Sequence, residues 1–298
     1  MKNILIIGCG LLGSSLLRQI KRKKITKKIY IYEKSKVNIS KIKKLKLPGT
    51  IIDKLQDGVT NSDLIILCTP MSEYKNLILK MNKFLSPKTV VTDVGSSKLE
   101  TSKIIKKFLR KDIFWTSSHP IAGSEVSGPE HGKHDLFQNK WCILIKEKKT
   151  NKDHLIILNK FWKKIGSKVA SMSPEKHDMI FSITSHLPHL IAYNLVKSAQ
   201  DFEKQKNYNL IKYSAGGLRD FSRIAASNEI MWRDIFFYNN KNMSKAIDLF
   251  IKNLNSFKKD INSKNNKSIL KKLIQTKKVR SKIIKLKQDI DKPDFGRN

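Results

Sequence analysis

The strongest constraint on this chain is a glycine-rich turn that follows an apolar run near its start. Ile4-Leu5-Ile6-Ile7 is typical of a buried strand, and a helical pattern over Leu11–Ile20 follows it. Glycines between a strand and a helix allow a tight turn and let the backbone approach a pyrophosphate at the helix N-terminus. The alternative is a turn that uses its glycines only for packing. We predict a dinucleotide-binding loop that includes Gly8, Gly10, Leu11, Leu12 and Gly13.

An acidic residue follows the next predicted strand, Lys28–Tyr32. Glu33 lies about 20 residues after Gly13, where a carboxylate accepts hydrogen bonds from the adenine ribose and repels a 2′-phosphate. NAD is therefore the expected cofactor. Lys34 and Lys36 keep NADP open, because a nearby cation can accommodate that phosphate.

The first half of the chain alternates apolar runs with helical patterns, which is typical of a parallel sheet with crossover helices. The expected strands are Asn3–Ile7, Lys28–Tyr32, Leu64–Leu67, Thr89–Thr92, Ile113–Thr116, Trp141–Ile145 and Lys168–Met172. The expected helices between them are Leu11–Ile20, Glu73–Phe84, Leu99–Leu109 and Asp153–Ile165. We predict an α/β Rossmann domain with a mostly parallel, doubly wound sheet over residues 1–172.

Only helical patterns follow that point. Ser173-Pro174 is typical of a capped helix start, and the helix it opens is expected to reach Ala199 with a kink at Pro188. Further helices are expected at Asn209–Tyr213, Leu218–Ala226, Ile230–Phe257 and Lys267–Asp289. Residues 173–298 are thus predicted to form an all-helical domain.

The composition excludes several classes of protein. The formal net charge is +35, but the lysines are spread along the chain without a finger, RNP or helix-turn-helix pattern, so we expect no nucleic-acid partner. No run approaches the roughly 20 apolar residues of a membrane span. Cys9, Cys68 and Cys142 lack CxxC spacing, which indicates a reducing cytoplasm and no zinc site.

Small polar residues follow two other predicted strands. Thr69 and Pro70 come after Leu64–Leu67, and Asp93 with Ser96 comes after Thr89–Thr92. Open α/β sheets bind ligands at the carboxyl ends of their strands, so these four residues are predicted to contact the cofactor. Ser96 could equally be only a helix cap.

A histidine in the stretch SSHPIAGSE is the candidate catalytic base. His119 is expected at the carboxyl edge of the sheet, beside the nicotinamide. A dehydrogenase needs a base for the hydroxyl proton when hydride leaves, and imidazole titrates near working pH. The alternative is a histidine that only binds loop backbone.

Arginine is scarce here, yet three of the eight arginines lie within Arg219–Arg233. A planar guanidinium holds a carboxylate bidentately, which lysine cannot do. At least one of them is therefore expected to bind an acidic substrate, unless Arg223 forms a structural ion pair with Asp220. His186 and His189, and the HGKHD stretch at His131–Asp135, lack matching carboxylate ligands, so no metal is expected.

These motifs together resemble a known family, the prephenate/arogenate (cyclohexadienyl) dehydrogenases of tyrosine biosynthesis. The resemblance covers nearly the whole chain, including the ending QDIDKPDFGRN. It is carried by GCGLLGSSL, TDVGSSK, SSHPIAGSEVSGPEHG, SPEKHDMIFSITSHLPHLIAYNLV and SAGGLRDFSRIAASNEIMWRDIF.

The resemblance implies an NAD(P)-linked oxidative decarboxylation of prephenate, arogenate or both, in which a cyclohexadienyl ring becomes aromatic. It implies a Rossmann domain followed by a helical substrate and dimerisation domain, and hence a homodimer whose pocket includes partner residues. His119 would be the base and Ser96 would position it. The implied substrate-binding residues are Ser124, His189, Arg223, Gly216 and Trp232.

Two other functions stay open at this point. One is another NAD-dependent hydroxyacid dehydrogenase with a helical second domain, although such enzymes usually carry a catalytic lysine and lack the histidine-proline loop. The other is a basic nucleic-acid-binding protein, which would show salt-sensitive binding to DNA.

Overall fold

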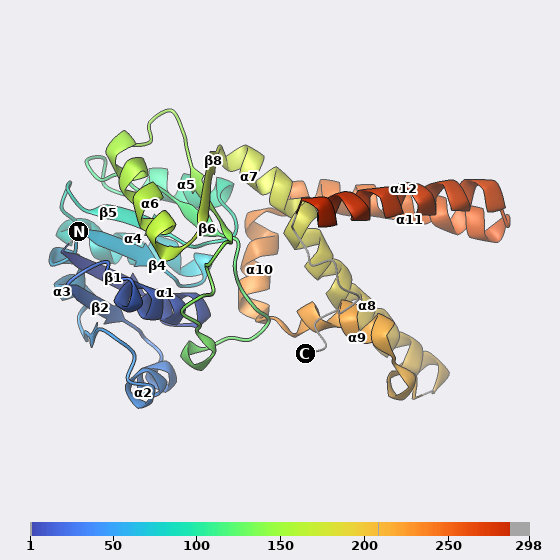
Figure 1. Ribbon diagram of the computed structural model, residues 1–298, viewed down its shortest axis with the longest axis horizontal. Helices are drawn as coiled ribbons and strands as arrows, with labels where there is room; N and C mark the ends of the chain where they lie inside the picture. The colour runs from blue at the N-terminus through green and yellow to red at the C-terminus, as the bar shows by residue number, and fades with distance from the viewer. Residues whose placement is uncertain (1, 208, 287–298) are drawn as a thin grey trace.

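A parallel sheet occupies the centre of the first half of the chain (Figure 1). The computed structural model describes residues 2–207 and 209–286, and in this part the sheet has the order β3-β2-β1-β4-β5. Its strands are β1 (Asn3–Ile7), β2 (Lys28–Tyr32), β3 (Thr50–Ile51), β4 (Leu64–Leu67) and β5 (Val90–Asp93). The order reverses between β1 and β4, so the ligand crevice of this sheet type lies beyond their carboxyl ends.

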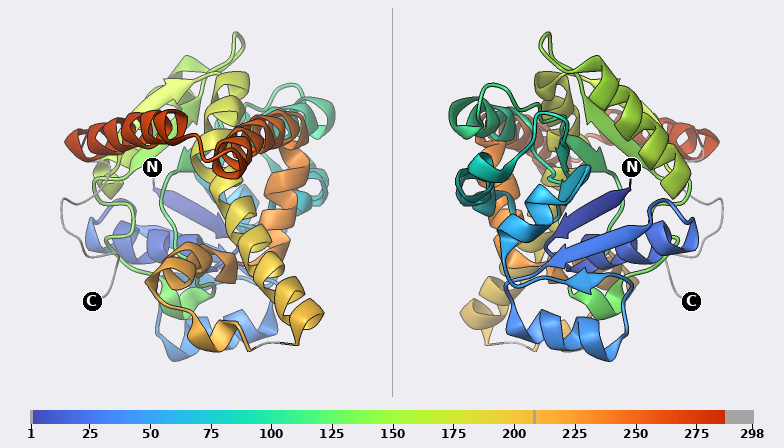
Figure 2. Two further views of the ribbon diagram at one scale, coloured as in Figure 1. Left: turned by 90° about the vertical axis from the view of Figure 1, so that its right-hand side faces the viewer. Right: turned by 90° about the vertical axis from the view of Figure 1, so that its left-hand side faces the viewer.

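Strand β1 is buried on both faces, as its unbroken apolar run predicts. Ile4 and Ile6 pack into the core cluster on one side of the sheet, and Leu5 and Ile7 pack into the cluster on the other. Helices cover both faces (Figure 2). They are α1 (Leu11–Arg22), α2 (Lys36–Lys44), α3 (Leu55–Thr60), α4 (Tyr74–Met81), α5 (Leu99–Phe108) and α6 (Lys152–Ile165).

A second, smaller sheet adjoins β5, with the order β6-β7-β8. It consists of β6 (Ser118–Pro120), β7 (Trp141–Ile145) and β8 (Lys168–Met172). The expected strand at Ile113–Thr116 was wrong, because only an isolated bridge joins Trp115 to Val91. Beyond it, the Ser117 carbonyl accepts the Ile145 N–H at 2.9 Å, so the chain leaves β5 and pairs with β7. His119 therefore lies within a strand and not after one.

The second half of the chain is helical in the part that the structure describes. Its elements are α7 (Pro174–Phe181), the π-helical segment η4 (Ser182–His186), α8 (Leu187–Lys206), α9 (Gly216–Ser222), the short helix η6 (Arg223–Ala226), α10 (Glu229–Tyr238), α11 (Asn240–Asn262) and α12 (Asn266–Lys285). Helices α11 and α12 form a hairpin that extends away from the sheets (Figure 1). The end of the predicted helix Lys267–Asp289 and the stretch QDIDKPDFGRN lie outside the described residues.

Two predicted helices differ from the structure for local reasons. A π-helical turn precedes Pro188 and interrupts the expected helix, because proline supplies no N–H to the carbonyl four residues earlier. The helix expected over Ile230–Phe257 ends at Tyr238, and a new one begins after Asn239. The Asn239 side chain donates to the Asp178 carbonyl at 2.8 Å, which fixes this break.

Helix α10 belongs to the helical half of the chain and binds the sheet half through side-chain hydrogen bonds. The Asp234 carboxylate accepts the Ser72 N–H at 2.9 Å, and the Tyr238 hydroxyl donates to the Met71 carbonyl at 3.2 Å. Both partners lie in the short helix η1 (Met71–Glu73), which follows β4. The helical half is thereby held against the carboxyl end of the sheet.

Replacement of Gly13 tests the packing of the glycine turn. A Cβ at Gly13 would lie 2.2 Å from the Gly8 carbonyl oxygen, whereas a Cβ at Gly10 meets nothing within 4 Å. We expect Gly13→Ala to lower the free energy of unfolding by about 3 kcal/mol, measured by urea unfolding. Gly10→Ala is the matched control and should leave stability within about 1 kcal/mol of wild type. Equal stability of the two variants would contradict this packing.

Candidate active site

The glycine turn and Glu33 together form the predicted dinucleotide site. Gly8 has φ +88°, a conformation that glycine adopts without strain, and its position lies against the Thr69 side chain. The Glu33 carboxylate accepts the Cys9 N–H at 2.8 Å and the Ser35 N–H at 2.9 Å. These bonds hold the acid beside the turn, at the end of β2.

The N-terminus of α1 is suited to a pyrophosphate. Gly10 caps this helix without a side-chain hydrogen bond, and a side chain at Gly10 would point into open space. Backbone N–H groups of Leu11 and Leu12 in the first turn, with the helix dipole, favour an anion there. The residues present therefore fit NAD, and Glu33 would receive its adenine ribose.

The other predicted cofactor residues surround this turn in different ways. The Thr69 hydroxyl is buried without a hydrogen-bond partner among the described residues, and Pro70 precedes the short helix η1. Asp93 is fully buried. Its carboxylate accepts hydrogen bonds from Gly95 N–H, Tyr74, Trp115 and Lys98, so it supports the loop after β5 from within.

His119 is oriented by a histidine that the sequence analysis did not select. His177, on α7, has its Nε2 2.8 Å from Nδ1 of His119, and Nδ1 of His177 lies 2.7 Å from Oδ1 of Asp178. An ionised carboxylate can only accept, so His177 donates to Asp178 and its Nε2 accepts from His119. This assignment leaves Nε2 of His119 as the proton-accepting nitrogen.

Burial keeps these imidazoles uncharged. His119 is 8% exposed, and its pKa is lowered well below its usual value, first by burial and then by His177 and Lys98. Burial also lowers the pKa of His177, while the hydrogen bond to Asp178 opposes that effect. A neutral His119 is available to take a proton from a hydroxyl group.

Ser96 lies in the loop between β5 and α5. Among the described residues, no hydrogen bond joins the Ser96 hydroxyl to His119. The Ser96 backbone instead lies next to His186. His186 is fully buried, and its Nδ1 lies 3.1 Å from the Asn239 side-chain nitrogen. The π-helical turn η4 carries His186 to this inner position, so His186 supports the loop from below.

The expected substrate residues fall into two groups, the first of which surrounds Trp232. His189 stacks on the Trp232 ring with centroids 3.8 Å apart and donates from Nδ1 to the Ser185 carbonyl at 2.9 Å. Trp232 is buried, and its indole N–H has no partner among residues 2–207 and 209–286. An aromatic wall with a free donor suits a small ring that carries oxygens.

The second group surrounds Arg223 at the start of η6. Its guanidinium donates to Oε2 of Glu125 at 3.0 Å, and Ser124 donates to the same carboxylate at 3.1 Å. The ion pair considered from the sequence, Arg223 with Asp220, does not form. Asp220 lies beside Arg219 instead. Arg223 can therefore hold a carboxylate close to the loop that follows β6.

Gly216 stands apart from both groups. It begins α9, a helix with no buried residue, and no described contact joins it to His119. Within one chain its predicted role in shaping the pocket stays a prediction.

No described group of three His, Cys, Asp or Glu side chains could hold a metal ion. No described helix is long and apolar enough to cross a membrane.

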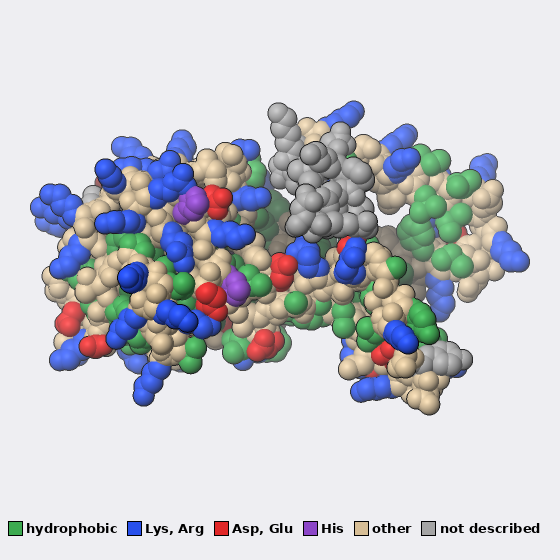
Figure 3. All heavy atoms as spheres, turned by 60° about the horizontal axis from the view of Figure 1, so that its bottom comes forward, with side chains coloured by type: hydrophobic (Ala, Val, Ile, Leu, Met, Phe, Trp, Pro, Cys, Tyr) green, Lys and Arg blue, Asp and Glu red, His purple; other side chains and the backbone are tan. Residues whose placement is uncertain are grey.

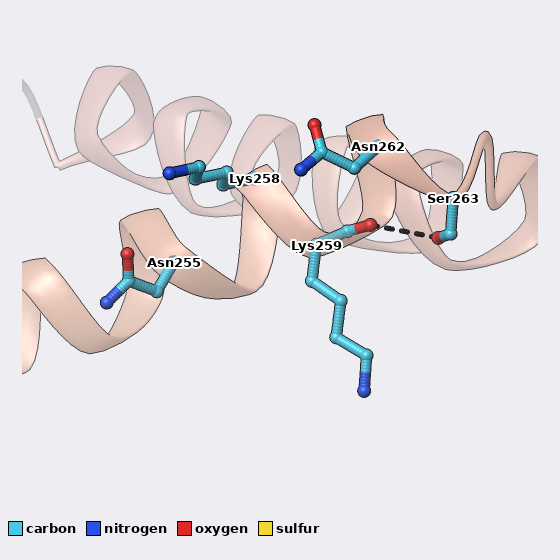
Figure 4. A pocket seen from close by; sticks show the side chains of 5 residues that line it. All are labelled: Asn255, Lys258, Lys259, Asn262 and Ser263. Atoms are coloured by element: carbon cyan, nitrogen blue, oxygen red, sulfur yellow. Dashed lines mark hydrogen bonds between the residues drawn. The ribbon is translucent and has the colours of Figure 1, made fainter.

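An open depression on α11 near its turn to α12 is lined by Asn255, Lys258, Lys259, Asn262 and Ser263 (Figure 4). It lies at the far end of the hairpin from the sheets, and the Ser263 hydroxyl donates to the backbone of Lys259 at 2.9 Å.

The fold and this site define a nicotinamide-dependent dehydrogenase with a helical second domain. Comparison with known proteins identifies its family. Residues 16–171 match the prephenate dehydrogenase nucleotide-binding domain, and residues 173–276 match the prephenate dehydrogenase dimerization domain. The chain belongs to the prephenate dehydrogenase family.

Individual relatives agree over nearly the full chain. The cyclohexadienyl dehydrogenase of Zymomonas mobilis is 33% identical over 97% of this chain and 98% of its own length. The crystal structure of prephenate dehydrogenase from Aquifex aeolicus, with hydroxyphenyl propionate and NAD+, has a TM-score of 0.88 at 36% identity and covers 95% of this chain and 98% of that one. The Synechocystis arogenate dehydrogenase has the same fold, with a TM-score of 0.76 at 23% identity over 94% of this chain and 99% of that one. This chain is an NAD-dependent oxidoreductase for an oxidative decarboxylation in tyrosine biosynthesis.

The buried histidines make stability depend on pH. Burial lowers the pKa of His186 from 6.5 to about 4, so between these values the unfolded chain binds more protons than the folded one. The contribution of the uncharged His186 to the free energy of unfolding is therefore complete above pH 6.5 and is lost as the pH falls toward 4. We expect His186 to contribute about 2 kcal/mol to this loss, measured by urea unfolding from pH 7 to 4.5. His186→Gln should flatten the slope, and an equally steep slope in that variant would contradict this assignment.

Proposed function

We propose that this chain oxidises prephenate, arogenate or both, with His119 as the base and with products 4-hydroxyphenylpyruvate, tyrosine or both. The observation that carries the proposal is the Asp178-His177-His119 chain of hydrogen bonds. It presents one neutral imidazole nitrogen, Nε2 of His119, as a proton acceptor. The alternative hydroxyacid dehydrogenase is not favoured, because the family models cover the chain on both sides of residue 172.

The reaction follows from what each side chain can do. Bound NAD, held by the glycine turn and Glu33, would supply the acceptor for the hydride of the ring carbon that carries the hydroxyl. Nε2 of His119 takes the hydroxyl proton as the hydride leaves. When carbon dioxide leaves, the electron pair of the ring–carboxylate bond enters the ring, and the ring oxygen takes this proton back from His119 as the phenol forms. Because the ring becomes aromatic, no separate acid is needed for the carboxyl group. The hydrogen bond from His119 to His177 keeps the imidazole in its accepting tautomer throughout.

The remaining residues bind and orient the ligands in this proposal. Arg223 holds a substrate carboxylate, and Ser124, His189 and Trp232 line the ring. Gly8, Gly10, Leu11, Leu12 and Gly13 cradle the pyrophosphate, with Thr69, Pro70, Asp93 and Ser96 shaping the loops around the nicotinamide. Glu33 binds the adenine ribose and selects NAD over NADP.

We also propose a homodimer formed through the helical half, with residues 1–172 and 173–298 as the two domains. Helix α12 has no buried residue within its own chain. Apolar side chains lie exposed along the hairpin (Figure 3), among them Leu249, Leu254, Leu270, Leu273, Ile274 and Val279. A second copy would cover them, and α9 with Gly216 would then complete a pocket. Three free cysteines agree with a cytoplasmic enzyme.

The activity assay combines NAD or NADP with prephenate or arogenate, and follows the reduced nicotinamide by absorbance. We expect turnover with NAD and at least one of the two substrates, and weaker turnover with NADP because Glu33 repels its 2′-phosphate. His119→Asn should lower kcat while leaving NAD affinity near wild type, since its ring lies outside the glycine turn. Absence of turnover in all four combinations would overturn the proposed function.

Truncation of Arg223 tests carboxylate binding. We expect Arg223→Ala to raise the substrate KM by about 10- to 100-fold, because a charge-assisted hydrogen bond to the substrate is lost. Arg219→Ala is the matched control, since Arg219 is exposed beside Asp220. A KM that stays constant in Arg223→Ala and rises in Arg219→Ala would transfer the role to Arg219.

A further inference from the structure

Lys98 is a charged side chain that the proposed mechanism does not use, and it is fully buried. Its Nζ lies 2.6 Å from Oδ2 of Asp93 and donates to the Ser118 carbonyl at 2.7 Å. Taking both charges of an ion pair out of water costs several kcal/mol per ion, so such a pair is weak evidence of a purely stabilising role. Its position next to β6 indicates a role at His119.

Lys98 contacts three elements around His119. Its ammonium bonds the carbonyl of the residue just before His119, on β6, and its ion pair holds Asp93 at the end of β5. Its backbone N–H donates to Oδ1 of Asp178 at 2.8 Å, the same oxygen that faces His177. A change at Lys98 is therefore transmitted to both ends of the histidine chain.

The charge of Lys98 acts on the imidazoles in one direction. It lowers the pKa of His119 and of His177, after the larger effect of burial, because a nearby cation disfavours a second positive charge. Asp93 opposes it at His177, and its carboxylate is also bound by Gly95 N–H, Tyr74 and Trp115. The titratable or charged groups around His119 are Asp93, Lys98, Cys142, His177, Asp178 and His186, with Tyr74 behind Asp93.

We propose that Lys98 is a positioning residue for His119: its ammonium anchors β6 through the Ser118 carbonyl and places a buried positive charge one residue from the imidazole. The proposal rests on the role of His119 as the base. It adds a cation that never touches the substrate yet sets the pH range in which the base is ready.

The test compares Lys98→Gln, which removes the charge and keeps a hydrogen-bond donor, with Lys98→Arg, which keeps the charge. The readouts are the pH profile of kcat/KM with NAD and the NMR titration of the histidine rings in the protein without cofactor. We expect the acid limb and the His119 titration of Lys98→Gln to move to higher pH by about one unit. Lys98→Arg should retain the wild-type values.

Identical titrations in wild type and Lys98→Gln would overturn the proposal, because a purely structural lysine would change activity without moving them. If Lys98→Gln does not fold, the titration of the wild-type protein is the test. A His119 ring that takes up its proton at or above pH 6.5 would also overturn the proposal. The ring titration needs no turnover, so a failure of the proposed function would appear separately, as an inactive wild type in the four-combination assay.

Discussion

The Asp178 carboxylate is the interaction on which the rest of the site depends. It accepts the backbone N–H groups of Lys98 and Leu99 at the start of α5, at 2.8 and 2.9 Å, and the imidazole of His177 at 2.7 Å. The positive end of the α5 dipole favours this anion. Because the carboxylate can only accept, it determines which nitrogen carries the proton in His177 and then in His119. One buried anion from the helical half thus defines the reactive atom on the sheet half.

The site combines buried charge with little exposed polarity. Asp93 and Lys98 have fully buried side chains, and His177 and His186 are fully buried as well. In a medium of low dielectric constant, every such group must be paired in one arrangement, since an unpaired one is costly. The network therefore gives up stability for a single geometry around His119. The outer part of the pocket differs, because Arg223 is more than half exposed and exchanges partners at low cost.

The fold was largely predictable where apolar runs are continuous. The bounds expected for β1, β2, β4, β7 and β8 agree with the structure. Strands β1, β4 and β7 are continuous apolar runs that are buried along most of their length. Helix α2 and strand β3 were missed, since Ile42 is the one buried residue of α2 and β3 has two residues. The strand expected at Ile113–Thr116 failed because its backbone meets β5 only at Trp115 and Thr116. The chain then pairs with β7 from Ser117 onward, which no local pattern reveals.

By itself the sequence determined the Rossmann and helical fold class, the glycine turn with Glu33, the family, and His119 as the candidate base. These are local signals, since each depends on residues close together in the chain or on a motif read in order. Only the tertiary structure decided that His177 orients His119, that Lys98 lies beneath β6, and that Arg223 meets Glu125. The partners in the first and last of these contacts are 58 and 98 residues apart. Such pairs are brought together by the packing of whole helices against the sheets. The spacing of residues along the chain does not indicate these contacts.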